Sequence, residues 1–194
     1  TSTEFINRPQ VKTKDELKSL AQELFTEDAP EFLARIDWDN SSLEEAVEKA
    51  AVNTIEYAVR VAALANAEIA SGLPFYYYNF DAEIPGPDNP GAFHSVDLWF
   101  FFETLAKCWR PFVGKHYDLA RQMCNYWANF IKTGDPNGVD SDGTPMAEWP
   151  PFTDEKPYVM HLYDEKEKFG AKMDEPSELI RIFVDKIASD AVKN

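Results

Sequence analysis

Three histidines are the side chains of this sequence that could act as a general base near neutral pH, because imidazole titrates in that range. His94 ends a segment rich in glycine and proline, residues 84–94, which is expected to be a loop. Rigid scaffolds often present catalytic groups on such loops. His116 lies near the start of a polar helical segment and His161 in a strand-like segment, so both are predicted to be structural. The local context therefore favours His94 as the candidate base.

A carboxylate that accepts the Nδ1 hydrogen of a histidine fixes its tautomer and stabilises the imidazolium. Glu4 and Asp81 could do this for His94, although most acidic residues are solvated surface groups. Ser95 is a poor nucleophile candidate, because adjacent residues rarely aim both side chains at one substrate atom. No serine has the Gly-x-Ser-x-Gly setting of a nucleophile elbow. The sequence thus offers a base and candidate acids without a serine nucleophile.

The elements that would position these residues begin with two helices. Residues 13–16 and 42–45 are capping boxes, in which a serine or threonine oxygen and a glutamate carboxylate satisfy free backbone N–H groups of the first turn. Apolar residues follow each box at helical spacing. The second helix is expected to be the longer one, because an alanine-rich pattern continues without a break to residues 71–72.

Residues 74–80 form a compact aromatic run that is typical of a buried strand and leads into the loop before His94. Four further elements are expected: helices over residues 96–107 and 117–132, a strand over residues 157–162, and a last helix over residues 176–192. Helices with only two convincing strands make an incomplete α/β pattern, since a two-stranded sheet is marginal by itself.

Charge and composition exclude several kinds of partner. The 194 residues carry a formal net charge of −15, and the 19 lysines and arginines are scattered, so a phosphate backbone or an anionic bilayer would be repelled. No apolar run approaches the roughly 18 residues that a membrane helix requires. We therefore expect neither nucleic acid nor a membrane as a partner.

Cys108 and Cys124 are too few for a disulfide framework and lack the spacing of a zinc site. A disulfide between the two remains an alternative, but two small thiols in the core are the expected state.

Residues 91–98, Gly-Ala-Phe-His-Ser-Val-Asp-Leu, closely resemble the histidine motif of the type B carboxylesterases, the family of para-nitrobenzyl esterases and cholinesterases. Three further blocks resemble that family in the same order: the aromatic strand at residues 75–80, the helix and turn at residues 126–138, and Trp-Pro-Pro-Phe-Thr at residues 149–153. Together these blocks cover most of residues 75–162.

The resemblance implies that His94 is the catalytic base and Glu4 the triad acid. Residues 1–5 resemble the family segment that ends in this acid, and the separation of 90 residues is similar to that in bacterial relatives. A family member often has Asp before this Glu and Gly after it, whereas Thr3 and Phe5 stand here. Three aromatic residues are candidates for lining a substrate pocket: Phe5, Phe93 and Trp99.

The fold implied is α/β, with residues 1–194 forming the C-terminal part of a single α/β-hydrolase domain that is helix-rich and has few strands of the central sheet. The activity implied is hydrolysis of small-molecule carboxylic esters through an acyl-enzyme, with no metal or organic cofactor. The family's nucleophile elbow and oxyanion-hole glycines lie upstream of the acid. We therefore expect this chain to be inactive alone and to need a complementary N-terminal segment that carries the serine.

Two other roles stay open. One is a catalytically inactive, cholinesterase-like module for binding or assembly, since the fold is reused without the triad. The other is a stand-alone product whose apolar surface, left by the missing half, drives formation of a homo-oligomer or association with an N-terminal chain. The resemblance and the two cysteines favour a bacterial, cytoplasmic origin.

Overall fold

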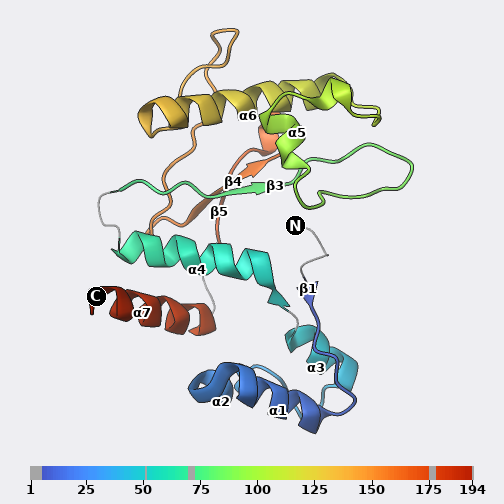
Figure 1. The fold of residues 1–194 in the computed structure, drawn as a ribbon, viewed down its shortest axis with the longest axis vertical. Helices are drawn as coiled ribbons and strands as arrows, with labels where there is room; N and C mark the ends of the chain where they lie inside the picture. The colour runs from blue at the N-terminus through green and yellow to red at the C-terminus, as the bar shows by residue number, and fades with distance from the viewer. Residues whose placement is uncertain (1–5, 51, 70–72, 175–177, 194) are drawn as a thin grey trace. The chain divides into compact units, whose positions relative to one another are not determined.

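The computed structural model describes residues 6–50, 52–69, 73–174 and 178–193. The chain divides into two compact units (Figure 1). The first unit contains the described part of residues 66–175 and carries His94. The second unit contains the described parts of residues 5–65 and 176–194 and is mostly helical.

The first helix of the second unit starts where the sequence predicts. In α1 (Lys14–Phe25), Thr13 Oγ1 accepts a hydrogen bond from Glu16 N–H at 3.1 Å, and the Glu16 carboxylate accepts one from Lys12 N–H at 2.6 Å. The short 3-10 helix η2 (Thr26–Asp28) and α2 (Ala29–Ala34) follow. Helices α1, α2 and α3 (Leu43–Ala50) enclose a small apolar core of Leu17, Ala21, Phe32, Ile36, Ala46 and Ala50.

The prediction of one long helix after Ser42 was wrong. Its capping box is present, since Ser42 Oγ accepts from Glu45 N–H at 3.1 Å, but the segment divides into three elements: α3 (Leu43–Ala50), the strand β2 (Val52–Asn53) and α4 (Thr54–Ile69). β2 pairs antiparallel with β1 (Ile6–Asn7). Pairing with a distant strand gives this backbone other hydrogen-bond partners, so it overrides the local alanine-rich pattern.

The last helix, α7 (Glu178–Val192), confirms the helix predicted over residues 176–192, of which residues 176 and 177 lie outside the described part of the chain. Ile180 and Val184 are buried, whereas Ile187 on the same helix is exposed. No helix among the described residues combines the length and the apolar character needed to cross a membrane.

The first unit is built on a mixed three-stranded sheet in the order β3-β4-β5. β3 (Tyr78–Phe80) lies parallel to β4 (Tyr158–Leu162), which pairs antiparallel with β5 (Ala171–Lys172). β4 agrees with the prediction, β3 is shorter than the predicted run, and β5 was not predicted. The expectation of a helix-rich α/β pattern with few strands is confirmed.

Two helices connect the parallel strands. The helix predicted over residues 96–107 is interrupted: α5 (Asp97–Phe101) ends where Thr104 N–H bonds back to Trp99 O at 2.9 Å and Glu103 adopts a left-handed φ of 49°. The 3-10 helix η3 (Leu105–Lys107) follows, and then α6 (Gly114–Thr133). α6 ends as predicted at Gly134, whose φ is 78° and whose N–H bonds to Phe130 O.

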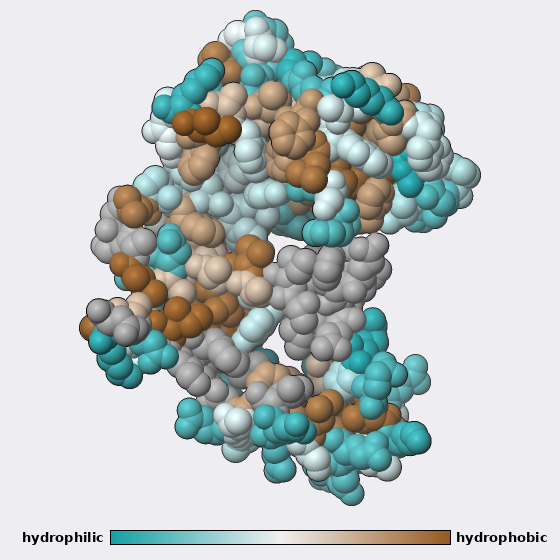
Figure 2. Space-filling view, in the orientation of Figure 1, coloured by the Kyte–Doolittle hydropathy of each residue, from teal (hydrophilic) through white to brown (hydrophobic). Residues whose placement is uncertain are grey.

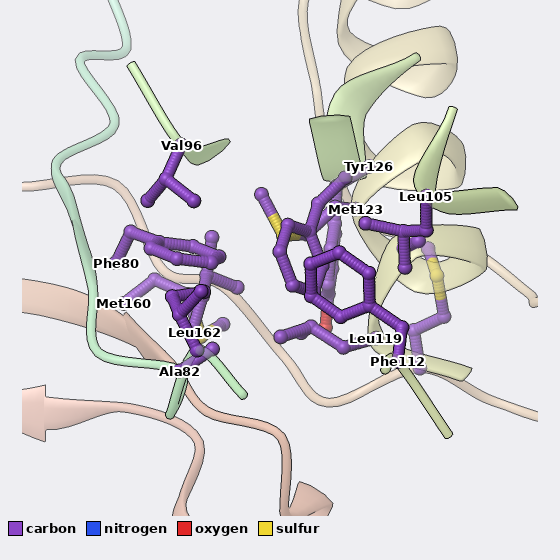
Figure 3. Close-up of a cluster of buried hydrophobic side chains, with 14 of the residues drawn as sticks. Phe80, Ala82, Val96, Leu105, Phe112, Leu119, Met123, Tyr126, Met160 and Leu162 are labelled. Carbon is purple, nitrogen blue, oxygen red and sulfur yellow. The ribbon is translucent and has the colours of Figure 1, made fainter. Parts of the chain in front are cut away.

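The core of the first unit lies between the strands and α6 (Figure 3). Phe80 from β3 and Met160 and Leu162 from β4 face Leu119 and Met123 of α6 in this cluster. All are less than a tenth exposed. Their burial holds the sheet against the helix, and with it the loop that leaves β3.

We expect Leu119→Ala to lower the free energy of unfolding by about 2–5 kcal/mol, because truncation of this buried side chain leaves a cavity in the core. The matched control is Ile131→Ala on the same helix, where the residue is 78% exposed and the loss is expected to stay within about 0.5 kcal/mol. Urea titration followed by tryptophan fluorescence measures both. Equal losses for the two variants would contradict the described core.

Candidate active site

His94 lies at the end of a loop, here named the histidine loop (residues 85–94), whose two ends are anchored in the core of the first unit. Before it, Ala82 and Ile84 are each 2% exposed, and after it Val96 is 1% exposed. The loop has no helix or strand, as its prolines and glycines predict. His94 is exposed. It lies at the end of this loop, three residues before α5 begins, which confirms its predicted place.

The backbone around His94 bends sharply. Phe93 N–H donates to Gly91 O at 3.1 Å, and Val96 N–H donates to Phe93 O at 3.2 Å. Ser95 has a φ of 66°, in the left-handed region that few residues other than glycine adopt. Strained conformations of this kind persist where the surrounding structure enforces them, and they cluster at functional sites.

Tyr78 links the strand before the loop to the helix after it. Its hydroxyl donates to Asp97 Oδ2 at 3.1 Å, and its ring packs edge-on against Phe101 and Trp127. Burial, followed by the nearby charge of Asp97, raises the pKa of Tyr78, so the hydroxyl stays protonated and keeps donating. This contact ties β3, which precedes the loop, to α5, which follows it.

Phe93 and Trp99 pack together beside the candidate base. Their ring centroids are 5.8 Å apart in an edge-to-face arrangement, and Trp99 makes a similar contact with Phe112 at 6.2 Å. Both are partly buried against the core, which fixes the position of the rings next to His94. Phe5, the third aromatic predicted to line a pocket, lies outside the described residues.

The two candidate acids have different outcomes. Glu4 lies outside the described residues, so its pairing with His94 stays a prediction. Asp81 pairs instead with His161, its Oδ2 accepting from the imidazole Nδ1–H, and its other oxygen accepts from Asn79 Nδ2 at 2.8 Å. The parallel register of β3 and β4, which sets Asn79 opposite His161, brings this pair together across 80 residues.

His116 is structural, as predicted. It is 3% exposed, its Nδ1 accepts from Val113 N–H at 3.0 Å, and its Nε2 lies 3.2 Å from Glu83 O. Because Nδ1 accepts, Nε2 carries the hydrogen and donates to the carbonyl. His116 therefore caps α6 and ties it to the chain that enters the histidine loop.

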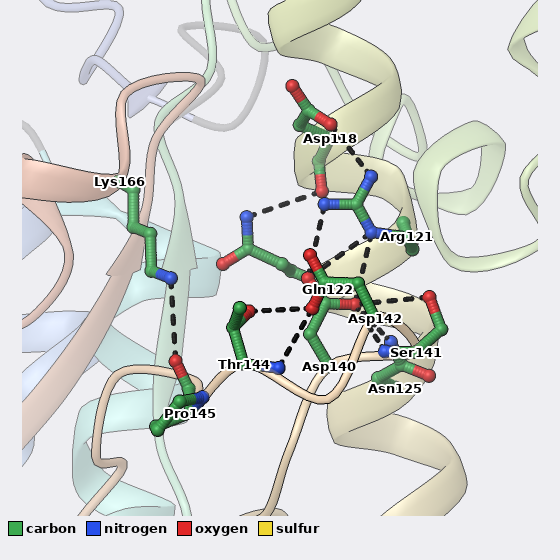
Figure 4. Close-up of polar contacts among 10 residues, drawn as sticks. All are labelled: Asp118, Arg121, Gln122, Asn125, Asp140, Ser141, Asp142, Thr144, Pro145 and Lys166. Atoms are coloured by element: carbon green, nitrogen blue, oxygen red, sulfur yellow. Dashed lines mark hydrogen bonds and ion pairs between the residues drawn. The ribbon is translucent and has the colours of Figure 1, made fainter.

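A polar cluster centred on Asp140 was not foreseen from the sequence (Figure 4). The Asp140 side chain is 2% exposed and accepts hydrogen bonds from Arg121 Nε at 3.0 Å, Asn125 Nδ2 at 2.7 Å and Ser141 N–H at 2.7 Å. Burial alone raises the pKa of this carboxyl, but the hydrogen bonds from Arg121 and Ser141 outweigh that cost, so the pKa is lowered. The cluster fastens the loop after α6 to the helix.

An open pocket of about 390 Å³ adjoins this cluster. It is lined mostly by charged residues of α6 and of the segments at residues 140–144 and 163–169, and no residue of the histidine loop lines it. In the described part of the chain, no three His, Cys, Asp or Glu side chains are grouped to hold a metal ion. Cys108 and Cys124 are separate thiols, as expected, but both are half-buried instead of fully buried in the core.

The comparisons with known proteins agree on one protein family. The sequence profile described as "Carboxylesterase family" matches residues 2–178. Carboxylesterase 4A of Bos taurus is 33% identical over 98 residues, which are 46% of this chain and 16% of that protein. Cholinesterase of Mus musculus is 28% identical over 123 residues, which are 62% of this chain and 20% of that protein. The chain thus spans about a fifth or less of the length of these relatives.

A solved structure of a PNB esterase is similar in fold. It aligns with 91% of this chain and 34% of its own chain, with a TM-score of 0.56 and 22% sequence identity. The helix-rich segment with its small mixed sheet therefore corresponds to part of the α/β-hydrolase fold of an esterase, which confirms the predicted fold class.

We expect Asp140→Asn to lower the free energy of unfolding by about 1–3 kcal/mol at pH 7, because it weakens charge-assisted hydrogen bonds in a buried site. The pKa of Asp140 is lower in the folded chain than its ordinary value of 3.8, so the carboxylate stabilises the fold above that value and loses its effect as the pH falls through the lowered pKa. The difference between wild type and variant is therefore expected to shrink below about pH 4.

Urea unfolding at pH 7 and at about pH 3 measures this difference. Asp118→Asn is the matched control, since Asp118 binds the same arginine at 2.7 Å but its side chain is 60% exposed. Its effect is expected to be at most about 1 kcal/mol. A difference for Asp140→Asn that stays constant with pH would contradict the assignment of its charge.

Proposed function

Because this chain belongs to the carboxylesterase family, we propose that it supplies the base and the acid of a serine carboxylic ester hydrolase. His94 is the base, Glu4 is the acid that orients it, and small-molecule esters are the substrates. The observation that most supports this proposal is the placement of His94, exposed at the end of a loop whose two ends are anchored in the core.

The proposed reaction follows the triad mechanism. A serine that is not among these 194 residues attacks the ester carbonyl, and His94 takes its proton and returns it to the leaving alcohol. Water, activated by the same base, then hydrolyses the acyl-enzyme. No step requires a metal ion or an organic cofactor. Since no Gly-x-Ser-x-Gly segment is present, the chain alone is expected to be inactive.

The other two histidines fit the role of base less well. His116 is buried, and both of its ring nitrogens lie within hydrogen-bonding distance of backbone groups. His161 has an acidic partner in Asp81, as a triad histidine does, but it is part of the sheet and stacks on Tyr163 with an interplanar angle of 15°. His161 is therefore the informative control for any test of His94.

A complementary segment that carries the nucleophile is the proposed partner. Apolar residues reach the surface among hydrophilic ones (Figure 2). Four large ones in the first unit are more than 70% exposed: Leu73, Phe102, Trp109 and Ile131. Exposed apolar area of this kind supports a protein partner, because covering it is favourable.

The test is hydrolysis of para-nitrophenyl acetate and butyrate by the chain alone and combined with the complementary segment. We expect activity only in the combination. His94→Ala is expected to lower kcat on the order of 10⁴–10⁶-fold, as loss of a triad histidine does, and Glu4→Gln on the order of 10⁴-fold.

His161→Ala serves as the matched control and is expected to retain kcat within about threefold, since His161 lies outside the proposed triad and takes no part in the chemistry. If His161→Ala abolished hydrolysis and His94→Ala did not, the base would be assigned to the wrong histidine. If a demonstrably folded combination showed no hydrolysis at all, the non-catalytic role in binding or assembly would be favoured.

A further inference from the structure

Arg110 contacts the histidine loop at three separate points. Its Nη1 donates to Pro85 O at 3.1 Å and to one Asp88 oxygen at 2.9 Å, while its Nη2 donates to the other Asp88 oxygen at 2.9 Å. Its guanidinium carbon lies 5.6 Å from the centre of the Phe93 ring. One side chain therefore holds the start of the loop, its middle, and the residue directly before His94.

The arginine is itself held firmly. Its side chain is only 7% exposed, and the ring of Trp109 lies 4.6 Å from the guanidinium carbon. Its carbonyl accepts from Phe112 N–H at 2.8 Å, and the Phe112 ring packs edge-on against Trp99 and Phe100 of α5. The segment that carries Arg110 is thus tied to the core through Phe112.

The loop sequence fits this arginine closely. A methyl group added at Gly86 would collide with Arg110 Nη1 and with Asp88 Oδ1, so the chain can approach the guanidinium only without a side chain there. The hydrogen bonds from Arg110 lower the pKa of Asp88, which keeps the carboxylate charged and able to accept both bonds. A planar guanidinium can make this forked contact, whereas a lysine ammonium cannot.

We infer that Arg110 is a positioning residue for the proposed base: it clamps the histidine loop so that His94 is presented in one place. This inference rests on the proposed function. A misplacement of about 1 Å in a catalytic group can cost on the order of 10²-fold in rate. Loss of the clamp is therefore expected to lower kcat by about 10- to 100-fold, with a smaller change in KM.

Three variants each change a different part of the contact between Arg110 and the histidine loop, here called the clamp: Arg110→Lys, Asp88→Asn and Gly86→Ala. The first keeps the positive charge but loses the fork, the second removes the negative charge, and the third keeps both charged groups and displaces the guanidinium. All three are expected to lower kcat in the combination of this chain with the segment that carries the nucleophile. The conservative lysine is not expected to restore it.

The matched control is Arg121→Lys. Arg121 makes the same kind of forked contact, to Asp140, but holds the loop after α6 instead of the histidine loop. This variant is expected to lose stability and to keep its kcat at temperatures where it is folded. The comparison separates a general loss of stability from a loss of His94 placement.

Amide hydrogen exchange gives a readout that does not depend on activity. The amides of Phe93 and Val96, which bond to Gly91 O and Phe93 O, are expected to exchange faster in the three clamp variants and unchanged in Arg121→Lys. Wild-type exchange or wild-type kcat in the clamp variants would overturn the inference. Full hydrolysis by His94→Ala would instead refute the proposed function, and the exchange rates would then decide whether Arg110 holds the loop.

Discussion

The parallel pairing of β3 with β4 is the interaction on which the first unit depends. It joins segments about 80 residues apart, and its register sets Tyr78 opposite Met160 and Phe80 opposite Leu162. Phe80, Met160 and Leu162 then form one wall of the core against α6 (Figure 3). The same pairing fixes where the chain leaves β3, and therefore where the histidine loop begins. It also places Asp81 beside His161, so Asp81 pairs with His161 and not with the candidate base His94.

Elements with local signals were predictable from the sequence. The capping threonine before α1, the glycine that ends α6 and the proline-rich histidine loop are determined by neighbouring residues, and the structure has all three. The break between α3 and α4, the end of α5 and strand β5 were missed. The first is set by the pairing of β2 with the distant strand β1, the second by a left-handed Glu103, and the third by the pairing of β5 with β4. Hydrophobic periodicity carries no signal for any of these.

The same distinction applies to the candidate site. His94 was found from its loop context and from the family motif, which are both local. Arg110 and Asp140 were not found, because their partners lie 22 and 19 residues away and charged residues are usually solvated. A mostly buried arginine is an informative feature in a chain with 34 acidic and 19 basic residues. Only the structure shows which arginines are buried in this way.

The contacts of Arg110 divide the histidine loop into parts with different freedom to vary. Pro85 to Asp88 are fixed by hydrogen bonds and by the lack of space at Gly86, and Phe93 is fixed by its ring. In the segment between Asp88 and Phe93, Asn89 and Gly91 adopt left-handed φ angles of 41° and 62°, and a Cβ added at Gly91 would meet no atom within 4 Å. Insertions and deletions during evolution would accumulate in this segment. The total length of the loop would then drift, while Phe93 and His94 keep their places at its end.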